Sequence, residues 1–223
     1  MSGAHYPIRF LGDALVFPPP EASSREGLLA AGGDLSPERL LLAYRSGIFP
    51  WFSDDSLILW WSPDPRMVLF PERLKVSRSM AKILQRGDFA ITKNQRFPEV
   101  IRACAQIRRK GQPGTWITEE MVEAYIQLHR LGYAVSYEAW QEGELVGGLY
   151  GVEPGGIFCG ESMFSKVSNA SKAAFIYMVR EQAALGCRLI DCQMYTPHLA
   201  SLGAEPVPRA DFLHILRESQ KQA

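Results

Sequence analysis

The clearest pattern of apolar and polar positions lies between residues 133 and 165, where it predicts three consecutive β-strands. Residues 133–140 and 144–152 are rich in β-branched and aromatic residues, and they flank a Glu-Gly pair at 142–143. This arrangement is typical of a β-hairpin. A glycine-rich turn at 153–156 then leads into a third apolar stretch. We therefore expect a meander of three antiparallel strands.

A long helix and one more strand follow this meander. Residues 169–185 show the apolar spacing of a helix that ends at Gly186, and residues 188–193 read as a short strand. A strand, a crossover helix and a second strand in succession predict a parallel strand pair. A parallel pair inside an otherwise antiparallel sheet creates a place where a ligand can enter.

The remaining chain alternates short helices and strands. A Ser-Pro pair at 36–37 predicts a helix start, and this helix should run through Tyr44 and stop at Gly47. Helices are also expected at 76–86, 98–109 and 119–131, and strands at 57–61, 67–70 and 89–92. Residues 1–26 read as irregular and residues 27–35 as a glycine-punctuated turn region.

The segment Ser-Pro-Asp-Pro-Arg at 62–66 predicts a domain boundary. The expected organisation is a small N-terminal domain over residues 1–65 and a larger domain over residues 66–223. Helices and mixed strands in this order make the fold class α+β.

Composition places the chain among globular proteins, with 223 residues of which 47% are hydrophobic. The N-terminus lacks a basic-then-apolar signal and no apolar run is long enough to span a bilayer, so we expect a cytoplasmic protein with no membrane partner. The four cysteines and four histidines are too dispersed for a metal site. Reduced thiols and no metal are the expectation.

Charge is distributed unevenly although the net charge is zero. Residues 66–110 carry twelve Lys or Arg against three Asp or Glu, which is a net of +9. A solvated helical surface would explain an ordinary charge run, but this block favours contact with a polyanion, most simply nucleic-acid phosphate. The candidate contacts lie on the polar faces of two predicted helices: Arg78, Lys82, Arg86, Arg102, Arg108 and Arg109.

Three polar residues mark candidate chemistry near strand ends. Glu161 lies in a run of apolar and small residues, where a charge is costly unless it is paired or faces a cleft. Strand alternation places Asp191 and Gln193 on one face, and Ile190 and Cys192 on the other. Cys192 therefore reads as a buried structural thiol facing away from Asp191. His198 is close to this strand end, where a loop role is the simpler interpretation.

Several longer motifs resemble the bacterial leucyl/phenylalanyl-tRNA–protein transferases, in that family's order and over nearly the whole chain. They are Gly-Gly-Asp-Leu (32–35), Ala-Tyr-Arg-Ser-Gly-Ile-Phe-Pro-Trp (43–51), Trp-Trp-Ser-Pro-Asp-Pro-Arg (60–66), Thr-Trp-Ile-Thr (115–118), Leu-Val-Gly-Gly-Leu-Tyr-Gly (145–151), Gly-Glu-Ser-Met-Phe-Ser (160–165), Asn-Ala-Ser-Lys (169–172), Ile-Asp-Cys-Gln (190–193) and His-Leu-Ala-Ser-Leu-Gly (198–203).

The resemblance implies an aminoacyl transferase that moves leucine or phenylalanine from tRNA to the N-terminal amine of proteins beginning with arginine or lysine. Such proteins are thereby marked for degradation. The implied donors are leucyl- and phenylalanyl-tRNA, with methionyl-tRNA weaker, and no cofactor is expected. The larger domain should resemble the acyl-CoA-dependent N-acetyltransferases. The resemblance gives no oligomeric state, and a monomer is expected.

The same resemblance implies roles for particular residues. Asp191 with Gln193 would draw the proton from the attacking amine, and Trp116 would stack on the terminal adenine of the tRNA. The transferred side chain would enter an apolar pocket formed by Leu149, Met163, Phe175, Met178 and Ile190. The residues that match family positions at the cleft are Tyr44, Trp51, Tyr125 and Glu161.

Two other functions remain open from the residues alone. An acetyltransferase that uses an acyl-CoA needs a glycine-bearing pyrophosphate loop before the crossover helix, but residues 165–171 contain no glycine. Retention of CoA would support that alternative.

A plain RNA-binding module would suit the basic block, but it leaves Asp191 and Glu161 without a purpose. Such a module would bind charged and uncharged tRNA equally and would never release an amino acid onto a peptide.

Overall fold

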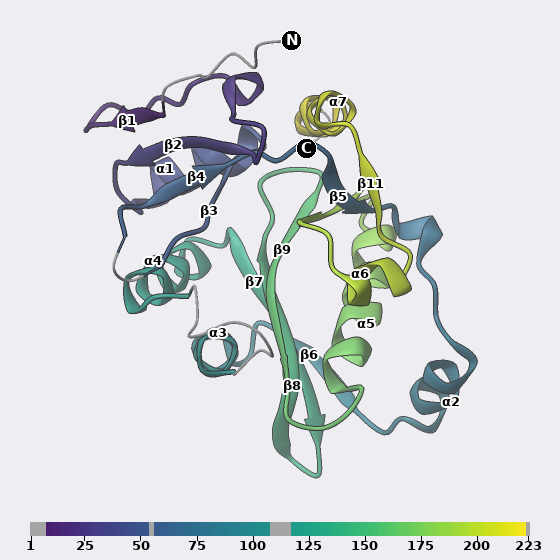
Figure 1. The fold of residues 1–223 in the computed structure, drawn as a ribbon. Helices are drawn as coiled ribbons and strands as arrows, with labels where there is room; N and C mark the ends of the chain where they lie inside the picture. The colour runs from purple at the N-terminus through teal and green to yellow at the C-terminus, as the bar shows by residue number, and fades with distance from the viewer. Residues whose placement is uncertain (1–7, 54–55, 108–116, 222–223) are drawn as a thin grey trace.

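Two β-sheets organise the chain (Figure 1). The computed structural model describes residues 8–53, 56–107 and 117–221. The smaller sheet has four strands in the order β1-β2-β4-β3, and the larger has seven in the order β11-β5-β10-β9-β8-β7-β6. The smaller sheet contains β1 (Arg9–Leu11), β2 (Leu28–Gly32), β3 (Phe49–Pro50) and β4 (Leu59–Trp61). The larger contains β5 (Arg66–Leu69), β6 (Ala90–Lys93), β7 (Ala134–Gln141), β8 (Glu144–Val152), β9 (Phe158–Ser165), β10 (Ile190–Gln193) and β11 (Glu205–Val207).

Helices cover both faces of the larger sheet. They are α1 (Pro37–Arg45), α2 (Arg78–Arg86), α3 (Phe97–Gln106), α4 (Glu119–Arg130), α5 (Ala170–Ala184), α6 (Pro197–Ser201) and α7 (Arg209–Gln220), with short 3-10 turns at Pro20–Ala22 and Pro71–Arg73. The predicted α+β fold with a mixed sheet is confirmed.

The predicted parallel pair is present and short. β10 and β9 run parallel with α5 as the crossover between them, and their pairing joins only Ile190 to Phe158 and Asp191 to Cys159. All other neighbouring strands of this sheet are antiparallel. Beyond the two pairs, β9 and β10 separate, and the sheet opens there.

The large sheet separates two layers of helices. Successive residues of β8 point to opposite faces: Leu149 shares a core with Phe175 of α5, whereas Tyr150 packs edge-on against Phe97 of α3 and Tyr125 of α4. α2 joins the α5 side, where Met80 packs against α5. Figure 1 accordingly shows α2 and α3 on opposite sides of the sheet.

Most predicted helix ends are confirmed by their caps. The Ser36 hydroxyl accepts a hydrogen bond from the Arg39 amide, and Thr118 accepts one from Met121, so each satisfies an otherwise unpaired amide of a first turn. α2 ends at Gly87, whose φ of 70° is the left-handed conformation that glycine adopts without strain.

Three elements differ from expectation. Residues 28–32 form β2 instead of a turn, because Leu29, Ala30 and Ala31 are buried and the strand pairs with β4. β1 occupies part of the segment predicted to be irregular. α3 ends at Gln106 and not at residue 109, since Ile107 already has extended backbone angles.

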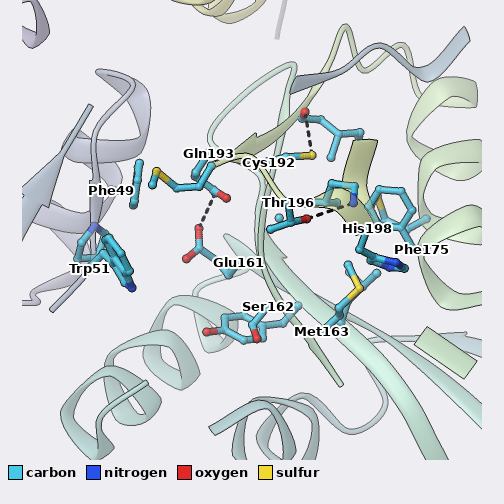
Figure 2. A pocket seen from close by; sticks show the side chains of 18 residues that line it. Phe49, Trp51, Glu161, Ser162, Met163, Phe175, Cys192, Gln193, Thr196 and His198 are labelled. Atoms are coloured by element: carbon cyan, nitrogen blue, oxygen red, sulfur yellow. Dashed lines mark hydrogen bonds between the residues drawn. The ribbon is translucent and has the colours of Figure 1, made fainter. Parts of the chain in front are cut away.

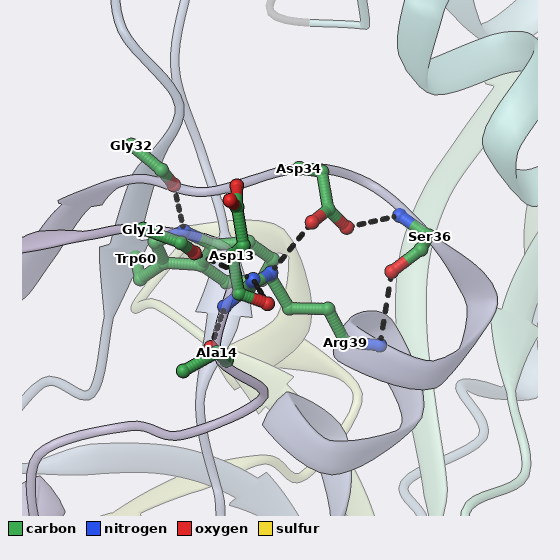
Figure 3. Close-up of polar contacts among 8 residues, drawn as sticks. All are labelled: Gly12, Asp13, Ala14, Gly32, Asp34, Ser36, Arg39 and Trp60. Atoms are coloured by element: carbon green, nitrogen blue, oxygen red, sulfur yellow. Dashed lines mark hydrogen bonds and ion pairs between the residues drawn. The ribbon is translucent and has the colours of Figure 1, made fainter.

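The N-terminal segment is held in place by one buried guanidinium (Figure 3). Arg39 donates to the carbonyl oxygens of Gly12, Asp13 and Ala14, and it pairs with Asp34 at 3.2 Å. Five donors in a fixed plane let arginine satisfy several carbonyls at once.

One hydrophobic core runs through both sheets. It joins Leu40 and Trp60 of the N-terminal region to Tyr150 and Phe212 of the remaining chain. The two sheets divide near residue 65, but the shared core means that a boundary between two independent domains stays a prediction.

Candidate active site

A pocket of about 400 Å³ opens where β9 and β10 separate (Figure 2). This volume suits a small apolar ligand. Its apolar lining includes all five residues predicted for the transferred side chain: Leu149, Met163, Phe175, Met178 and Ile190. Trp51 also lines the pocket and packs edge-on against Trp61. The structure therefore places all five predicted residues in one pocket, whereas their role toward a substrate stays a prediction.

Glu161 reaches the pocket because of a β-bulge. In the β8–β9 pair, Tyr150 lies opposite Ser162 and Gly151 lies opposite Gly160, so Glu161 is the extra residue. A bulge re-aims a side chain that regular alternation would place elsewhere. Glu161 is half-buried in the pocket wall.

Three polar side chains surround the Glu161 carboxylate. The Tyr125 hydroxyl donates to Oε2 at 3.4 Å, and the Gln193 carboxamide donates to Oε1 at 3.3 Å (Figure 2). The Tyr44 hydroxyl hydrogen-bonds in turn with Tyr125. The predicted cleft residues Tyr44, Tyr125 and Glu161 thus form one chain. Both tyrosines lie behind the pocket surface and are at most 1% exposed.

Burial raises the pKa of Glu161 to about 8, and the negative charge of Asp191 adds to this effect, while hydrogen bonds from the two tyrosines and the charge of Arg66 oppose it. Burial, followed by the charge of Glu161, also raises the pKa values of Tyr44 and Tyr125. Both phenols are therefore neutral donors near neutral pH, and Glu161 exchanges a proton within the physiological range.

Asp191 lies behind the pocket in an ion pair with Arg66. The guanidinium donates to both carboxylate oxygens, at 2.8 and 2.7 Å, and both side chains are 1% exposed. The Arg66 guanidinium is also stacked between the rings of Phe49 and Phe212, at 4.8 and 4.6 Å. Phe49 lines the pocket but Asp191 does not. Arg66 was not a predicted site residue. The one sequence feature that could have pointed to it is its position at the end of the proline-rich segment 62–66.

The expected alternation along β10 does not hold. Asp191 and Gln193 lie opposite the adjacent residues Val68 and Met67, so Cys192 is the extra residue of a second bulge. The φ of Gln193 is +56°, a left-handed conformation in a non-glycine residue. Consequently Gln193 and Cys192 both line the pocket while Asp191 does not. The predicted shared face of Asp191 and Gln193 is therefore wrong, whereas Cys192 is buried as predicted and lines the pocket from which Asp191 is absent.

Asp191 nevertheless contacts the site through the backbone. Its Oδ1 accepts the Gln193 amide at 3.0 Å. This bond holds Gln193 in its strained conformation and directs the carboxamide toward Glu161. Asp191 is thus placed to orient Gln193.

The far end of the pocket is lined by Thr196, His198 and Leu199 from α6 and its cap, so His198 is a pocket residue as well as part of a helix (Figure 2). Burial and the charge of Lys172 lower the pKa of His198. Trp116, predicted to stack on adenine, lies outside the described residues, as do Arg108 and Arg109.

The basic segment is partly neutralised by carboxylates, of which Asp88 and Glu99 lie within the segment and the others elsewhere in the chain. Arg86 pairs with Asp88, and Arg102 pairs with Glu123. The other paired cations of residues 66–107 are Arg66, Arg73, Lys93 and Arg96. Within this described part, only Lys75, Arg78 and Lys82 have no carboxylate within salt-bridge distance, and all three lie on or just before α2.

Two searches for other kinds of site give negative results over the described ranges. Among residues 8–53, 56–107 and 117–221, no three His, Cys, Asp or Glu side chains are grouped so as to hold a metal ion. No helix in those ranges is long and apolar enough to cross a membrane.

An apolar pocket with a few convergent polar groups and a carboxyl group of raised pKa in its wall has the features of a binding or active site. A family model described as leucyl/phenylalanyl-tRNA protein transferase matches residues 68–217, and a model of that family's N-terminal domain matches residues 33–64. The chain belongs to this family and is an aminoacyltransferase.

Similar proteins agree with this assignment. The chain is 56% identical over 208 residues to the leucyl/phenylalanyl-tRNA–protein transferase of Flavobacterium johnsoniae, which covers 93% of this chain and 98% of the relative. It is 59% identical over 214 residues to that of Chromobacterium violaceum, covering 95% and 91%.

Solved structures with a similar arrangement are more distant. L-PGS from Bacillus licheniformis matches with a TM-score of 0.42 and 15% identity, covering 74% of this chain and 55% of that one. A GCN5-related N-acetyltransferase from Kribbella flavida matches with a TM-score of 0.38 and 12% identity, covering 74% and 58%.

Proposed function

We propose that this enzyme transfers leucine or phenylalanine from aminoacyl-tRNA to the α-amine of proteins that begin with arginine or lysine, and so marks them for degradation. The observation that carries this proposal is the apolar pocket whose wall contains Glu161 and Gln193. The five apolar lining residues receive the transferred side chain, and the polar wall receives the incoming amine.

The pocket supports selection by size and polarity. Met163 and Met178 are flexible and polarizable, so the slot can accept leucine, phenylalanine and, more weakly, methionine. Apolar pockets discriminate one methylene by only about 1–3 kcal/mol. Valine should therefore be a poor donor, whereas aspartate should be excluded by the cost of burying its charge.

Asp191 and Gln193 act together on the incoming amine. Gln193 presents its carboxamide to the pocket, where its oxygen can accept a hydrogen bond from the amine. Asp191 acts through Gln193, since both of its oxygens are engaged by Arg66 and one also accepts the Gln193 amide. The geometry therefore favours Asp191 as a positioning residue over Asp191 as a direct base.

The tRNA phosphates contact the basic surface of α2. Arg78 and Lys82 are exposed and have no described carboxylate partner, whereas Arg86 and Arg102 each have one. Because the sheet separates α2 from α3, one straight segment of the tRNA backbone does not contact both helices. Arg78 and Lys82 should dominate, with Arg86 and Arg102 weaker.

The test is transfer of labelled leucine from leucyl-tRNA to a peptide that begins with arginine. A matched peptide with an acetylated N-terminus is the control, because it lacks a free α-amine. Label should appear only in the free-amine peptide. An absence of transfer to arginine- and lysine-starting peptides, or acetylation of the peptide by acetyl-CoA without tRNA, would contradict the proposal.

A further inference from the structure

We propose that Glu161 is a catalytic residue of this reaction: its carboxylate takes the proton from the attacking amine and returns it to the departing ribose oxygen. The proposal rests on the proposed transfer activity and extends it by naming where the proton goes. Three observations support it: the residues that line the pocket, the ion pair of Asp191 with Arg66 behind the pocket, and the groups that face Glu161.

The first observation is that Glu161 is the one carboxylate among the described residues that line the pocket. The bulge at Glu161 directs its side chain into the gap between β9 and β10. Gln193 and Glu161 are joined at 3.3 Å, so an amine that bonds to the Gln193 carboxamide oxygen lies beside the Glu161 carboxylate. A general base has to be within hydrogen-bond reach of the proton it removes.

The second observation is that Asp191 is already neutralised. Its two oxygens face the Arg66 guanidinium in a bidentate pair that is almost completely buried. Protonation of that carboxylate would leave the Arg66 charge buried without its counter-charge, at a large cost. Within the part of the chain that the structure describes, Glu161 has no cation at salt-bridge distance, and its hydrogen-bond donors Tyr125 and Gln193 are neutral.

The third observation concerns the groups that face Glu161 from each neighbouring element. They are Tyr44 of α1, Tyr125 of α4, Asp191 and Gln193 of β10, Arg66 of β5 and Cys159 of β9. Burial raises the pKa of Glu161 to about 8, and a free α-amine has a pKa of about 8. A pKa near the operating pH lets Glu161 take up a proton in one step and release it in the next.

The reaction needs no co-reactant, because every bond formed or broken and every proton transferred is accounted for. The amine nitrogen attacks the ester carbonyl carbon, a C–N bond forms, and one N–H proton passes to Glu161. When the tetrahedral intermediate collapses, the bond between the carbonyl carbon and the ribose oxygen breaks. Glu161 then returns its proton to that oxygen, which leaves an amide and a free tRNA hydroxyl.

Tyr44 and Tyr125 position the base. Their hydroxyls form a buried chain that ends at Glu161, so Tyr125 donates to the carboxylate and limits its rotation. Removal of the Tyr125 hydroxyl should therefore change the pH dependence of transfer more than it changes the affinity for leucyl-tRNA.

The experiment separates titration of the enzyme from titration of the acceptor. Single-turnover transfer from leucyl-tRNA is measured as a function of pH with two peptides, one with an ordinary N-terminal arginine and one whose α-amine is replaced by an aminooxy group. The aminooxy nitrogen is unprotonated over the range tested, so any remaining inflection belongs to the enzyme or to the α-amine of the leucyl-tRNA donor, and its loss in Glu161→Gln assigns it to Glu161. With the aminooxy peptide, the wild-type rate should rise with pH through an inflection at a pH of about 8.

Glu161→Gln should remove that inflection and lower the rate by about 10²–10⁴-fold, with leucyl-tRNA affinity unchanged. Glu161→Asp should retain an inflection and recover part of the rate. Glu181→Gln is the matched control, because Glu181 pairs with Lys93 and Tyr137 away from the pocket. Its rate and profile should match those of the wild type.

Different results overturn different claims. A wild-type enzyme that moves no leucine to the arginine peptide contradicts the proposed function itself. If the wild type transfers leucine and Glu161→Gln keeps its rate, or loses tRNA affinity in proportion to rate, Glu161 is not the base. A wild-type rate that does not change with pH for the aminooxy peptide would also show that Glu161 is not the base. This measurement uses the wild-type enzyme alone, so it does not depend on whether a variant folds.

Discussion

At the scale of single residues, the site depends on charges that are buried but not equivalent. Arg66 and Asp191 form a buried bidentate pair, which fixes the geometry behind the pocket. Glu161 is surrounded by neutral donors, so it can change its protonation state. The two carboxylates lie near one another but perform different tasks because only one has a cation of its own.

Asp191→Asn tests the ion pair. This substitution removes the counter-charge of a buried guanidinium, so we expect the free energy of unfolding to fall by roughly 3–5 kcal/mol, measured by urea denaturation. The double variant Arg66→Met with Asp191→Leu should recover much of the stability but not the transfer activity. Wild-type stability in Asp191→Asn would show that the pair contributes nothing.

The raised pKa of Glu161 predicts a pH dependence of stability. The carboxyl group has a pKa of about 8 in the folded protein, whereas its ordinary pKa is 4.5. Between these values the folded state keeps a proton that the unfolded state has lost, so the free energy of unfolding should fall as pH rises through this window. Melting temperatures across the same window should therefore fall less in Glu161→Gln than in the wild type. Parallel curves would contradict the assignment.

At the scale of elements, the two bulges and the two helix layers decide what the sheet can do. The bulges at Glu161 and Cys192 lie on the two strands that separate, and each turns a polar or soft side chain into the opening. The sheet also divides the basic segment, which places α2 on one face and α3 on the other.

Charge reversal on the two helices should therefore have unequal effects. Arg78→Glu with Lys82→Glu on α2 should weaken leucyl-tRNA binding and reduce the salt slope by about two units, since each phosphate contact contributes nearly one. Arg96→Glu with Arg102→Glu on α3 is the matched pair and should have the smaller effect. Filter binding across a salt series measures both. Equal effects would show that tRNA reaches both faces.

At the scale of the whole molecule, the last helix, α7, packs beside the site against residues of the N-terminal region and of the large sheet. Phe212 of the last helix stacks on Arg66, and Leu213 of that helix lies against the turn that ends α1. The N-terminal sheet, the large sheet and the C-terminal helix therefore share the packing that fixes Asp191.

Gly47→Ala tests this contact. Gly47 has a φ of +76°, and an added Cβ would lie 2.5 Å from Leu213 Cδ2. Gly87 is the control because its φ of +70° is similar and nothing lies within 4 Å of its added Cβ. Gly87→Ala should cost about 1–2 kcal/mol from backbone strain alone. Gly47→Ala should cost more, measured as a loss of unfolding free energy, and equal costs would contradict the close packing.

Local signals in the sequence determined most of the elements up to residue 193 and the crossover: the period of apolar residues, capping residues such as Ser36 and Thr118, and the order of strand, helix and strand. The members of the apolar pocket were implied by the resemblance to a known family. Only the tertiary structure decided which polar groups meet. A single bulge residue reverses the alternation on which the placement of Asp191 and Cys192 depended, and the pairing of Arg66 with Asp191 joins positions 125 residues apart. Strand periodicity carries no signal for either, because both depend on how neighbouring strands and distant side chains pack.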